Sequence, residues 1–262
     1  MVNVMGMLRF SLAVLIGIAA SPAQDSPEKL PAMATGANPG FEVVTVKPAV
    51  CASSCGTFFT TRGRHIIADN VSVTDLISLA WGVHVKQIVD GPPWLASERF
   101  DIDGLPDAYG KPSHNQLRLM MQKLLTSRFH IVSHHEQREL PVYALLPGKG
   151  GPKLTKTERQ PGDSTGFSYT NQIVLTVKNA TMADFADGMQ ASFMDRPVVD
   201  QTGLTGRYDF LLKWTPDESQ STGPEPPGLY TSIEQQLGLK LTPARARVHV
   251  LVIDRIEKPS EN

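Results

Sequence analysis

His65-Ile-Ile-Ala-Asp-Asn-Val-Ser-Val-Thr-Asp-Leu76 returns later in the chain, in altered form, as Val174-Leu-Thr-Val-Lys-Asn-Ala-Thr-Met-Ala-Asp-Phe185. The motifs that follow this stretch also occur twice and in the same order: Ile88-Val-Asp90 with Arg99-Phe-Asp-Ile102, then Val198-Val-Asp200 with Arg207-Tyr-Asp-Phe210. Motifs that recur at a constant spacing predict repeated structure, because each copy carries the same core and turn positions. The sequence therefore predicts two tandem copies of one small unit.

Each copy is predicted to contain both helices and strands, in the order β-α-β-β-α-β-β. Runs that alternate polar and apolar residues indicate strands, whereas apolar residues three and four positions apart indicate helices. The expected helices cover residues 75–82 and 115–127 in the first copy, and 182–193 and 230–237 in the second. Tight turns join neighbouring strands, which favours antiparallel or mixed sheets. The predicted fold class is α+β.

A pair of strands is expected to close each copy. In the first copy, residues 129–135 and 140–146 are predicted to form a hairpin across the polar residues between them. In the second copy, the strands are expected at 239–243 and 247–256. The run Val248–Ile253 is almost entirely apolar, which predicts a central position in a sheet.

The chain is predicted to have five consecutive parts: a signal peptide (1–23), a disordered leader (24–40), the first copy with an extra N-terminal strand and a cysteine loop (41–147), a connector (148–170) and the second copy (171–258). The leader and the connector are rich in proline, glycine and small or polar residues, as is typical of coil. The remaining length suits one large domain or two of about 100 to 120 residues. The connector favours two modules packed against each other.

Residues 1–23 have the features of a secretory signal peptide. Arg9 precedes the apolar run Phe10–Ala20, and Ser21-Pro-Ala23 then offers small residues to a signal peptidase. The run is shorter than the roughly 20 apolar residues of a membrane span, and an uncleaved N-terminal anchor is the alternative interpretation. We therefore expect an exported protein, periplasmic or extracellular, with no membrane span after signal cleavage.

Cys51 and Cys55 are the only cysteines of the chain. In an oxidising compartment, two cysteines this close are expected to form a disulfide. Closing so short a loop contributes roughly 2 kcal/mol in the loop-entropy view, so the bond would fasten a loop locally. A redox-active pair and half of a metal site are the alternatives. The Cys-x3-Cys spacing and the lack of a second pair argue against both.

The formal net charge of the chain is −1 at pH 7, and its lysines and arginines are scattered. Nucleic-acid-binding proteins normally carry a basic surface, and proteins that bind membrane surfaces often carry a basic amphipathic helix. The sequence has neither feature. We therefore expect no nucleic acid as a partner. Because the protein is expected to be exported, its expected partner is an envelope or secreted protein.

No metal site, cofactor site or catalytic residue is predicted. His134-His135-Glu136 is a group of metal-ligating residue types, but neighbouring strand residues point to opposite faces, so only His134 and Glu136 could share one. A solvated strand face is the favoured interpretation. Gly162-Asp-Ser-Thr-Gly166 has its serine one place away from the nucleophile pattern of hydrolases, and it lies in the connector.

The charged residues that recur are expected to serve the fold. Asp90 and Asp200 each precede a turn, where an aspartate accepts backbone N–H bonds. An arginine and an aspartate two positions apart lie on each repeated strand and are expected to form exposed ion pairs of little individual worth: Arg99 with Asp101, and Arg207 with Asp209.

Trp94 is the one candidate binding residue. It ends the rigid turn Gly91-Pro-Pro-Trp94, which could present a large ring to a ligand. Packing of the same ring over a helix is the alternative interpretation.

Several longer motifs resemble the soil-associated family of uncharacterised exported bacterial proteins. The resemblance spans about residues 41–258 and is carried by these stretches: Phe41-Glu-Val-Val-Thr-Val-Lys-Pro48, Gly91-Pro-Pro-Trp94 with Arg99-Phe-Asp-Ile102, Leu124-Leu-Thr-Ser-Arg-Phe129, Glu139-Leu-Pro-Val-Tyr143 and Pro197-Val-Val-Asp-Gln-Thr-Gly-Leu-Thr-Gly-Arg-Tyr-Asp209. The resemblance implies export and a shared fold, and it assigns no activity. Some relatives look fused to sensor-type membrane peptidases, which implies sensing or binding.

Each copy is also similar, in element order, to the short N-terminal modules of secretins and of signalling outer-membrane receptors. Residues Val198–Phe210 resemble the strand-turn-strand core of those modules, which bind other proteins and catalyse nothing. The sequence thus favours an exported, non-catalytic binding module. An exported hydrolase or peptidase-like enzyme with a loop-built site is the alternative, and a small-ligand sensor between the copies is a third interpretation.

Overall fold

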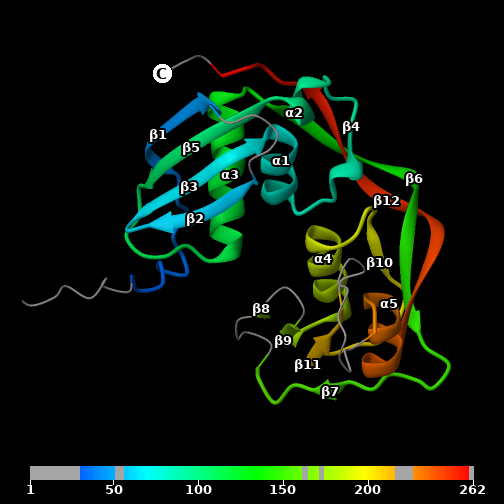
Figure 1. Ribbon diagram of the computed structural model, residues 1–262. Coiled ribbons are helices and arrows are strands. Elements are labelled where there is room, and N and C mark those ends of the chain that lie inside the picture. Colours follow the sequence, from blue (N-terminus) through cyan, green and yellow to red (C-terminus); the bar gives the residue numbers. More distant parts are fainter. Residues whose placement is uncertain (1–29, 51–55, 161–164, 171–173, 216–226, 260–262) are drawn as a thin grey trace, which may run out of the picture.

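The computed structural model describes residues 30–50, 56–160, 165–170, 174–215 and 227–259 (Figure 1). Within these residues the chain forms three four-stranded sheets with helices packed against them. Antiparallel and parallel strand pairs both occur, so the predicted α+β class with antiparallel or mixed sheets is confirmed. The predicted signal peptide lies outside the described residues.

The first sheet, which we call the N-terminal sheet, has the strand order β1-β5-β3-β2. Its neighbouring strands all run antiparallel. The four strands are β1 (Phe41–Pro48), β2 (Phe58–Arg62), β3 (His65–Ser72) and β5 (Arg99–Pro106).

Two helices, α1 (Val73–Trp81) and α3 (His114–Arg128), cover one face of the N-terminal sheet (Figure 1). A serine, Ser72 or Ser113, begins each helix. The serine hydroxyl accepts the backbone N–H of the residue three positions on. The side chain of that residue in turn accepts the backbone N–H of the serine. The apolar side of α3 is buried against the sheet, and Leu125 is 0% exposed. We call the cluster of buried apolar residues between these helices and the sheet the N-terminal core.

A second sheet, the C-terminal sheet, has the strand order β7-β11-β9-β8. Its strands are β7 (Thr155–Lys156), β8 (Gly166–Thr170), β9 (Val174–Ala180) and β11 (Tyr208–Lys213). Helix α4 (Met182–Ser192), the short helix α5 (Leu229–Ser232) and the π-helix that continues it (Ile233–Leu237) enclose the C-terminal core with this sheet. No helix in the described ranges has the length and apolar character needed to cross a membrane.

The third sheet, which we call the shared sheet, joins the other two. Its order is β10-β6-β12-β4, and its centre is a long antiparallel ribbon of β6 (Val132–Pro147) and β12 (Leu239–Arg255) along one side of the molecule (Figure 1). The short strand β4 (Ile88–Val89) pairs in parallel with β12, and β10 (Val198–Asp200) pairs in parallel with β6. Each short strand therefore pairs with a long strand that is distant in sequence.

The ribbon also completes both cores. Leu251 and Ile253, at the end of β12, belong to the N-terminal core. Tyr143 and Leu145, at the end of β6, belong to the C-terminal core. Burying an apolar side chain of this size contributes about 1.5 to 3 kcal/mol. Neither core is therefore complete without a strand from the other part of the chain.

The hairpin predicted within residues 129–146 is wrong, because this region is the single strand β6, paired with β12. The charged residues between the expected strands include no glycine, asparagine or proline that would reverse the chain.

The two separate strands predicted at 239–243 and 247–256 are also wrong, because Leu239–Arg255 is the single strand β12. Pro243 on β12 and Pro141 on β6 do not interrupt the ribbon. They lie at positions that are not paired with β4 or β10, so a missing N–H is tolerated on that side.

Two predicted coil segments are also corrected. Residues 31–40 are not a disordered leader, because Met33 is only 5% exposed and its N–H donates to the Lys111 carbonyl at 2.8 Å. The predicted connector 148–170 is not a plain boundary, because β7 and β8 lie within it and form the edges of the C-terminal sheet. Strands this short, flanked by proline and glycine, have no readable alternation.

Asn70 and Asn179 occupy the left-handed region, with φ of 55° and 53°. The N–H of Asn70 donates to Asp101 Oδ1 at 2.9 Å, and that of Asn179 donates to Asp209 Oδ1 at 2.7 Å. A register shift accompanies each asparagine in its strand pair. The two aspartates therefore fix a backbone irregularity just before each helix.

The arginines that were expected to pair with these aspartates bind elsewhere. Arg99 donates to Asp75 at 3.2 Å, and Arg207 lies 3.5 Å from Asp184. Both carboxylates belong to the first turn of a helix, α1 or α4. The predicted Arg99–Asp101 and Arg207–Asp209 ion pairs are thus wrong, because each arginine holds the start of a helix instead.

The 3-10 turn Val85–Gln87, which follows α1, contacts the segment just after α4. His84, which begins that turn, is buried; its Nε2 donates to the Met194 carbonyl at 3.2 Å, and its Nδ1 accepts the Lys86 N–H at 3.1 Å. A neutral imidazole satisfies both contacts. Burial, which disfavours the charged form, lowers the pKa of His84 from 6.5.

Acid is expected to weaken the folded state through His84. Because the folded pKa lies below the ordinary 6.5, the unfolded chain takes up the proton first as the pH falls. Stability is therefore retained above the unfolded pKa and is lost as the pH drops below it. Denaturant titrations between about pH 8 and pH 5 should show a smaller loss for His84→Gln than for the wild type. An equal loss in both proteins would contradict this assignment.

Candidate functional site

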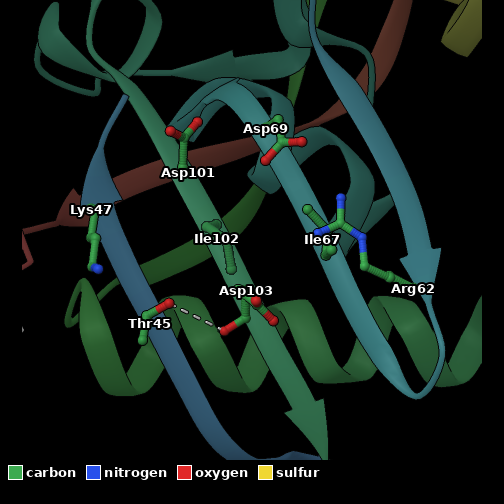
Figure 2. Close-up of a pocket in the computed structure, with 8 residues that line it drawn as sticks. All are labelled: Thr45, Lys47, Arg62, Ile67, Asp69, Asp101, Ile102 and Asp103. Carbon is green, nitrogen blue, oxygen red and sulfur yellow. Dashed lines mark hydrogen bonds between the residues drawn. The ribbon is translucent and has the colours of Figure 1, made fainter. Parts of the chain in front are cut away.

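An open hollow of 280 Å³ lies on the face of the N-terminal sheet opposite α1 and α3 (Figure 2). Its lining comes from β1, β5, β3 and β2: Thr45, Lys47, Arg62, Ile67, Asp69, Asp101, Ile102 and Asp103. Successive strand residues point to opposite faces. Residues such as Ile66 and Phe100 therefore enter the core, whereas the charged residues of the same strands stay outside.

The charges on this face partly satisfy one another. Asp103 Oδ1 lies 2.6 Å from Nδ1 of the exposed His65. Lys47 and Arg62 border the hollow from the two edge strands, with Asp69 and the other carboxylates between them (Figure 2). The hollow is thus a polar depression that carries charged side chains of both signs.

Strand β2 forms the edge of this face. It pairs with β3 on one side, and no other strand of the described residues pairs with it. All five of its residues are exposed, including Phe58 at 61% and Phe59 at 42%. An exposed apolar edge strand is a template for another strand, and proteins usually protect such edges with charge, proline or a covering element.

The corresponding edge of the C-terminal sheet, β8, is more covered. Tyr169 packs edge-on against Phe193 in the loop after α4, with ring centres 5.3 Å apart. Phe167 lies against Gly188, where an added Cβ would be 3.0 Å from its ring. Phe167 of β8 is thus covered by α4, whereas Tyr169 is 40% exposed, close to the 42% of Phe59; the clearest difference between the two edges is Phe58, at 61%.

Trp94 begins the short helix α2 (Trp94–Ser97) and is partly buried against the N-terminal core. The Lys258 ammonium lies 5.8 Å from the centre of its ring and also pairs with Glu98. The ring therefore packs on the core and is capped by a cation. This contact agrees with the packing interpretation of Trp94.

His134 and Glu136 share a strand face, as their spacing predicts, with Nε2 and Oε1 3.2 Å apart. His134 also contacts Asp254 at 2.9 Å. The hydrogen bonds to Asp254 and Glu136 raise the pKa of His134. No group of three or more metal-ligating side chains with a suitable arrangement is present in the described part of the chain.

The remaining predicted residues have separate surroundings. Asp200 Oδ1 accepts the Thr202 N–H at 2.9 Å, so the turn role predicted for Asp200 is confirmed. Asp90 has a φ of 63° and binds Arg138 at 2.6 Å, so its predicted role as an acceptor of backbone N–H bonds is wrong. Cys51, Cys55 and the Gly162–Gly166 serine lie outside the described residues.

The exposed strand β2 and the hollow beside it are not among the features predicted from the sequence. Phe58-Phe59-Thr60-Thr61 is a run of aromatic and β-branched residues between Gly56 and Gly63, which is a strand signal. The neighbouring cysteine pair led to a loop interpretation of the whole region. Exposure of the two rings could not be read from the sequence, because two adjacent phenylalanines normally indicate a buried strand.

The family described as a protein of unknown function (DUF3738) matches residues 74–256, from α1 to the end of β12. Strands β1, β2 and β3 precede this range. No curated protein and no solved structure matches the chain. Because the match covers more than half of its length, the chain belongs to the DUF3738 family, whose function is unknown.

Proposed function

We propose that this protein is an exported, non-catalytic binding module that holds an extended segment of an envelope or secreted protein along β2. The observation that supports this most directly is the exposure of β2, an edge strand with two accessible phenylalanines. Strand addition at a sheet edge is a common way to recognise an extended peptide.

Contacts on both faces of the sheet would strengthen such an added strand. Phe58 is opposite Asp69 and shares the outer face with the hollow, whereas Phe59 is opposite Ala68, which belongs to the core side. Alternate side chains of a bound strand would therefore each meet one ring. Each backbone hydrogen bond contributes about 0.5 to 1.5 kcal/mol, and each aromatic pair adds about 0.5 to 1.5 kcal/mol.

We further propose that the chain arose by internal duplication. The two outer sheets have corresponding strand orders, β1-β5-β3-β2 and β7-β11-β9-β8. Corresponding contacts recur around Asn70 and Asn179, from the left-handed backbone to the bond with an aspartate on the neighbouring strand. The backbone bond from Ala49 N to Arg99 O, at 2.9 Å, likewise has a counterpart from Thr157 N to Arg207 O, at 3.0 Å.

Export and sensing are part of the same proposal. The signal-like residues 1–23 and the closely spaced Cys51 and Cys55 support an oxidising compartment outside the cytosol. The resemblances to soil-associated exported proteins and to the modules of secretins and outer-membrane receptors support protein binding. The similarity to the secretin and receptor modules concerns element order and one short motif, so it counts as analogy.

Replacing Thr60 with lysine is expected to weaken capture of the partner by about tenfold, or about 1.4 kcal/mol. Thr60 is the central residue of β2, and a charge on an edge strand opposes addition of another strand. The chain from residue 24 onward would be immobilised and exposed to a cell-envelope extract of its own host. Mass spectrometry would identify the bound proteins, and titration of the purified partner would give the dissociation constant.

Ser168→Lys on β8 is the matched control, because it adds the same charge to the corresponding strand. This variant should bind the partner as the wild type does. The proposal fails if no envelope protein binds saturably, or if the two lysine variants weaken binding equally.

A further inference from the structure

A second hollow, of 370 Å³, lies on the C-terminal sheet far from β2 in sequence. Six residues line it: Lys156, Thr157, Arg159, Thr181, Gly206 and Arg207. They come from β7 and the residues that follow it, the position before α4, and the turn before β11. Three of the six carry a positive charge and none carries a negative one.

Arg207 is held in place by contacts outside the hollow. Its Nη1 donates to the Asn179 carbonyl at 2.6 Å and to Thr165 Oγ1 at 3.1 Å, and it lies 3.5 Å from Asp184. These contacts all use Nη1 and leave the side chain 28% exposed. An anchored guanidinium offers its other N–H groups in a fixed fork, which suits an oxyanion.

The other two cations are not anchored in this way. Lys156 and Arg159 are exposed, and neither lies within ion-pair distance of a carboxylate of the described residues, although Arg159 is close enough to Asp209 to help lower the pKa of that carboxyl. Asp209, the nearby acid, accepts the Asn179 N–H and a bond from the Thr157 side chain. The Thr157 hydroxyl also accepts the Arg159 N–H at 3.2 Å, which fixes the backbone that carries Arg159.

The start of α4 is already satisfied by its own side chains. Thr181 Oγ1 accepts the Asp184 N–H at 3.0 Å, and Asp184 accepts the Thr181 N–H at 2.9 Å. An acid therefore occupies the helix terminus. Any attraction for an anion in this hollow comes from the three cationic side chains.

The equivalent place on the N-terminal sheet lacks this charge. Ala49 there corresponds to Thr157, because each N–H donates to the carbonyl of the strand arginine, Arg99 or Arg207. By this correspondence, Pro48 takes the place of Lys156. Glu98 takes the place of Gly206, which lines the second hollow. The cluster of three cations is thus found on the C-terminal sheet and is not repeated at the equivalent place on the N-terminal sheet.

We propose that this second hollow binds the phosphate group of a small molecule or of a phosphorylated partner. An anchored guanidinium and two exposed cations that lie outside any close ion pair supply the charge that a doubly ionised tetrahedral oxyanion requires. The hollow is several times larger than the roughly 30 Å³ that one water occupies in the liquid. It therefore has room for the phosphate and for part of the group that carries it.

The test is titration of the chain from residue 24 onward with inorganic phosphate, by isothermal calorimetry at constant ionic strength. The Lys156→Gln/Arg159→Gln double variant should bind phosphate at least about tenfold more weakly than the wild type. Both residues are exposed, and circular dichroism should show an unchanged fold. Sulfate should compete with phosphate, whereas chloride at the same ionic strength should not.

Lys149→Gln/Lys240→Gln is the matched control, because both residues are exposed lysines outside the lining and the net charge changes equally. This control should bind phosphate as the wild type does. Tighter binding of phenyl phosphate than of inorganic phosphate would assign a phosphomonoester, and equal binding would assign the phosphate group alone. Absence of saturable binding at millimolar phosphate, or equal weakening in both double variants, would overturn the site.

Discussion

Phe185→Ala is expected to lower the free energy of unfolding by about 3 to 5 kcal/mol, the range for a large aromatic residue removed from a packed core. Phe185 is 0% exposed, and its ring packs edge-on against Phe210 with ring centres 5.0 Å apart. Alanine removes that contact and leaves a cavity beneath α4. Urea titration followed by far-ultraviolet circular dichroism would measure the loss.

Leu211→Ala is the control for this prediction, because Leu211 lies on the same strand as Phe210 and is 44% exposed. Its effect should remain below about 1 kcal/mol. Tryptophan fluorescence, which reports on Trp81 and Trp94 in the N-terminal core as well as on Trp214, should give the same midpoint as circular dichroism. Separate midpoints would mean that the shared sheet does not couple the two cores.

Gly238→Ala is expected to destabilise the protein by about 2 to 4 kcal/mol, for two reasons that add. Gly238 has a φ of +64°, a conformation that costs a residue with a side chain about 1 to 2 kcal/mol. An added Cβ would also lie 2.0 Å from the Gly151 carbonyl oxygen, which is a backbone atom that cannot rotate away. Thermal and urea unfolding of the variant would measure the cost.

Gly203→Ala separates these two reasons. Gly203 has nearly the same φ, +66°, but nothing lies within 4 Å of the position its Cβ would occupy. This variant should therefore show only the conformational cost of about 1 to 2 kcal/mol. If the two alanine variants were equally destabilised, the contact between Gly238 and Gly151 would have no energetic role.

The local elements could be predicted because their signals are local. Ser113 and Gln116 form a capping box that marks the start of α3, and Met120, Leu124 and their neighbours have helical spacing. The long strand β6 could not be predicted in the same way. Its charged middle resembles a turn in composition, and only its pairing with β12 shows that it continues.

The exchange of strands in the shared sheet was beyond sequence reasoning. Ile88 pairs beside Leu251, and Val198 beside Tyr143, across separations that no turn or periodicity specifies. The candidate sites share this limit. The strand signal around Phe58 is present in the sequence, but its exposure, and the meeting of Lys156 with Arg207 at one hollow, depend on the tertiary fold.

The order of chain synthesis gives the shared sheet a further consequence. Leu251 and Ile253 complete the N-terminal core, although they are synthesised after every other buried residue of that core. The apolar side of the N-terminal core that β12 covers therefore stays exposed until β12 has been synthesised. Removing the residues after about 245 should leave even the N-terminal sheet sensitive to proteases, although that sheet itself is intact in sequence. Resistance of the N-terminal half to proteolysis thus depends on the synthesis of β12.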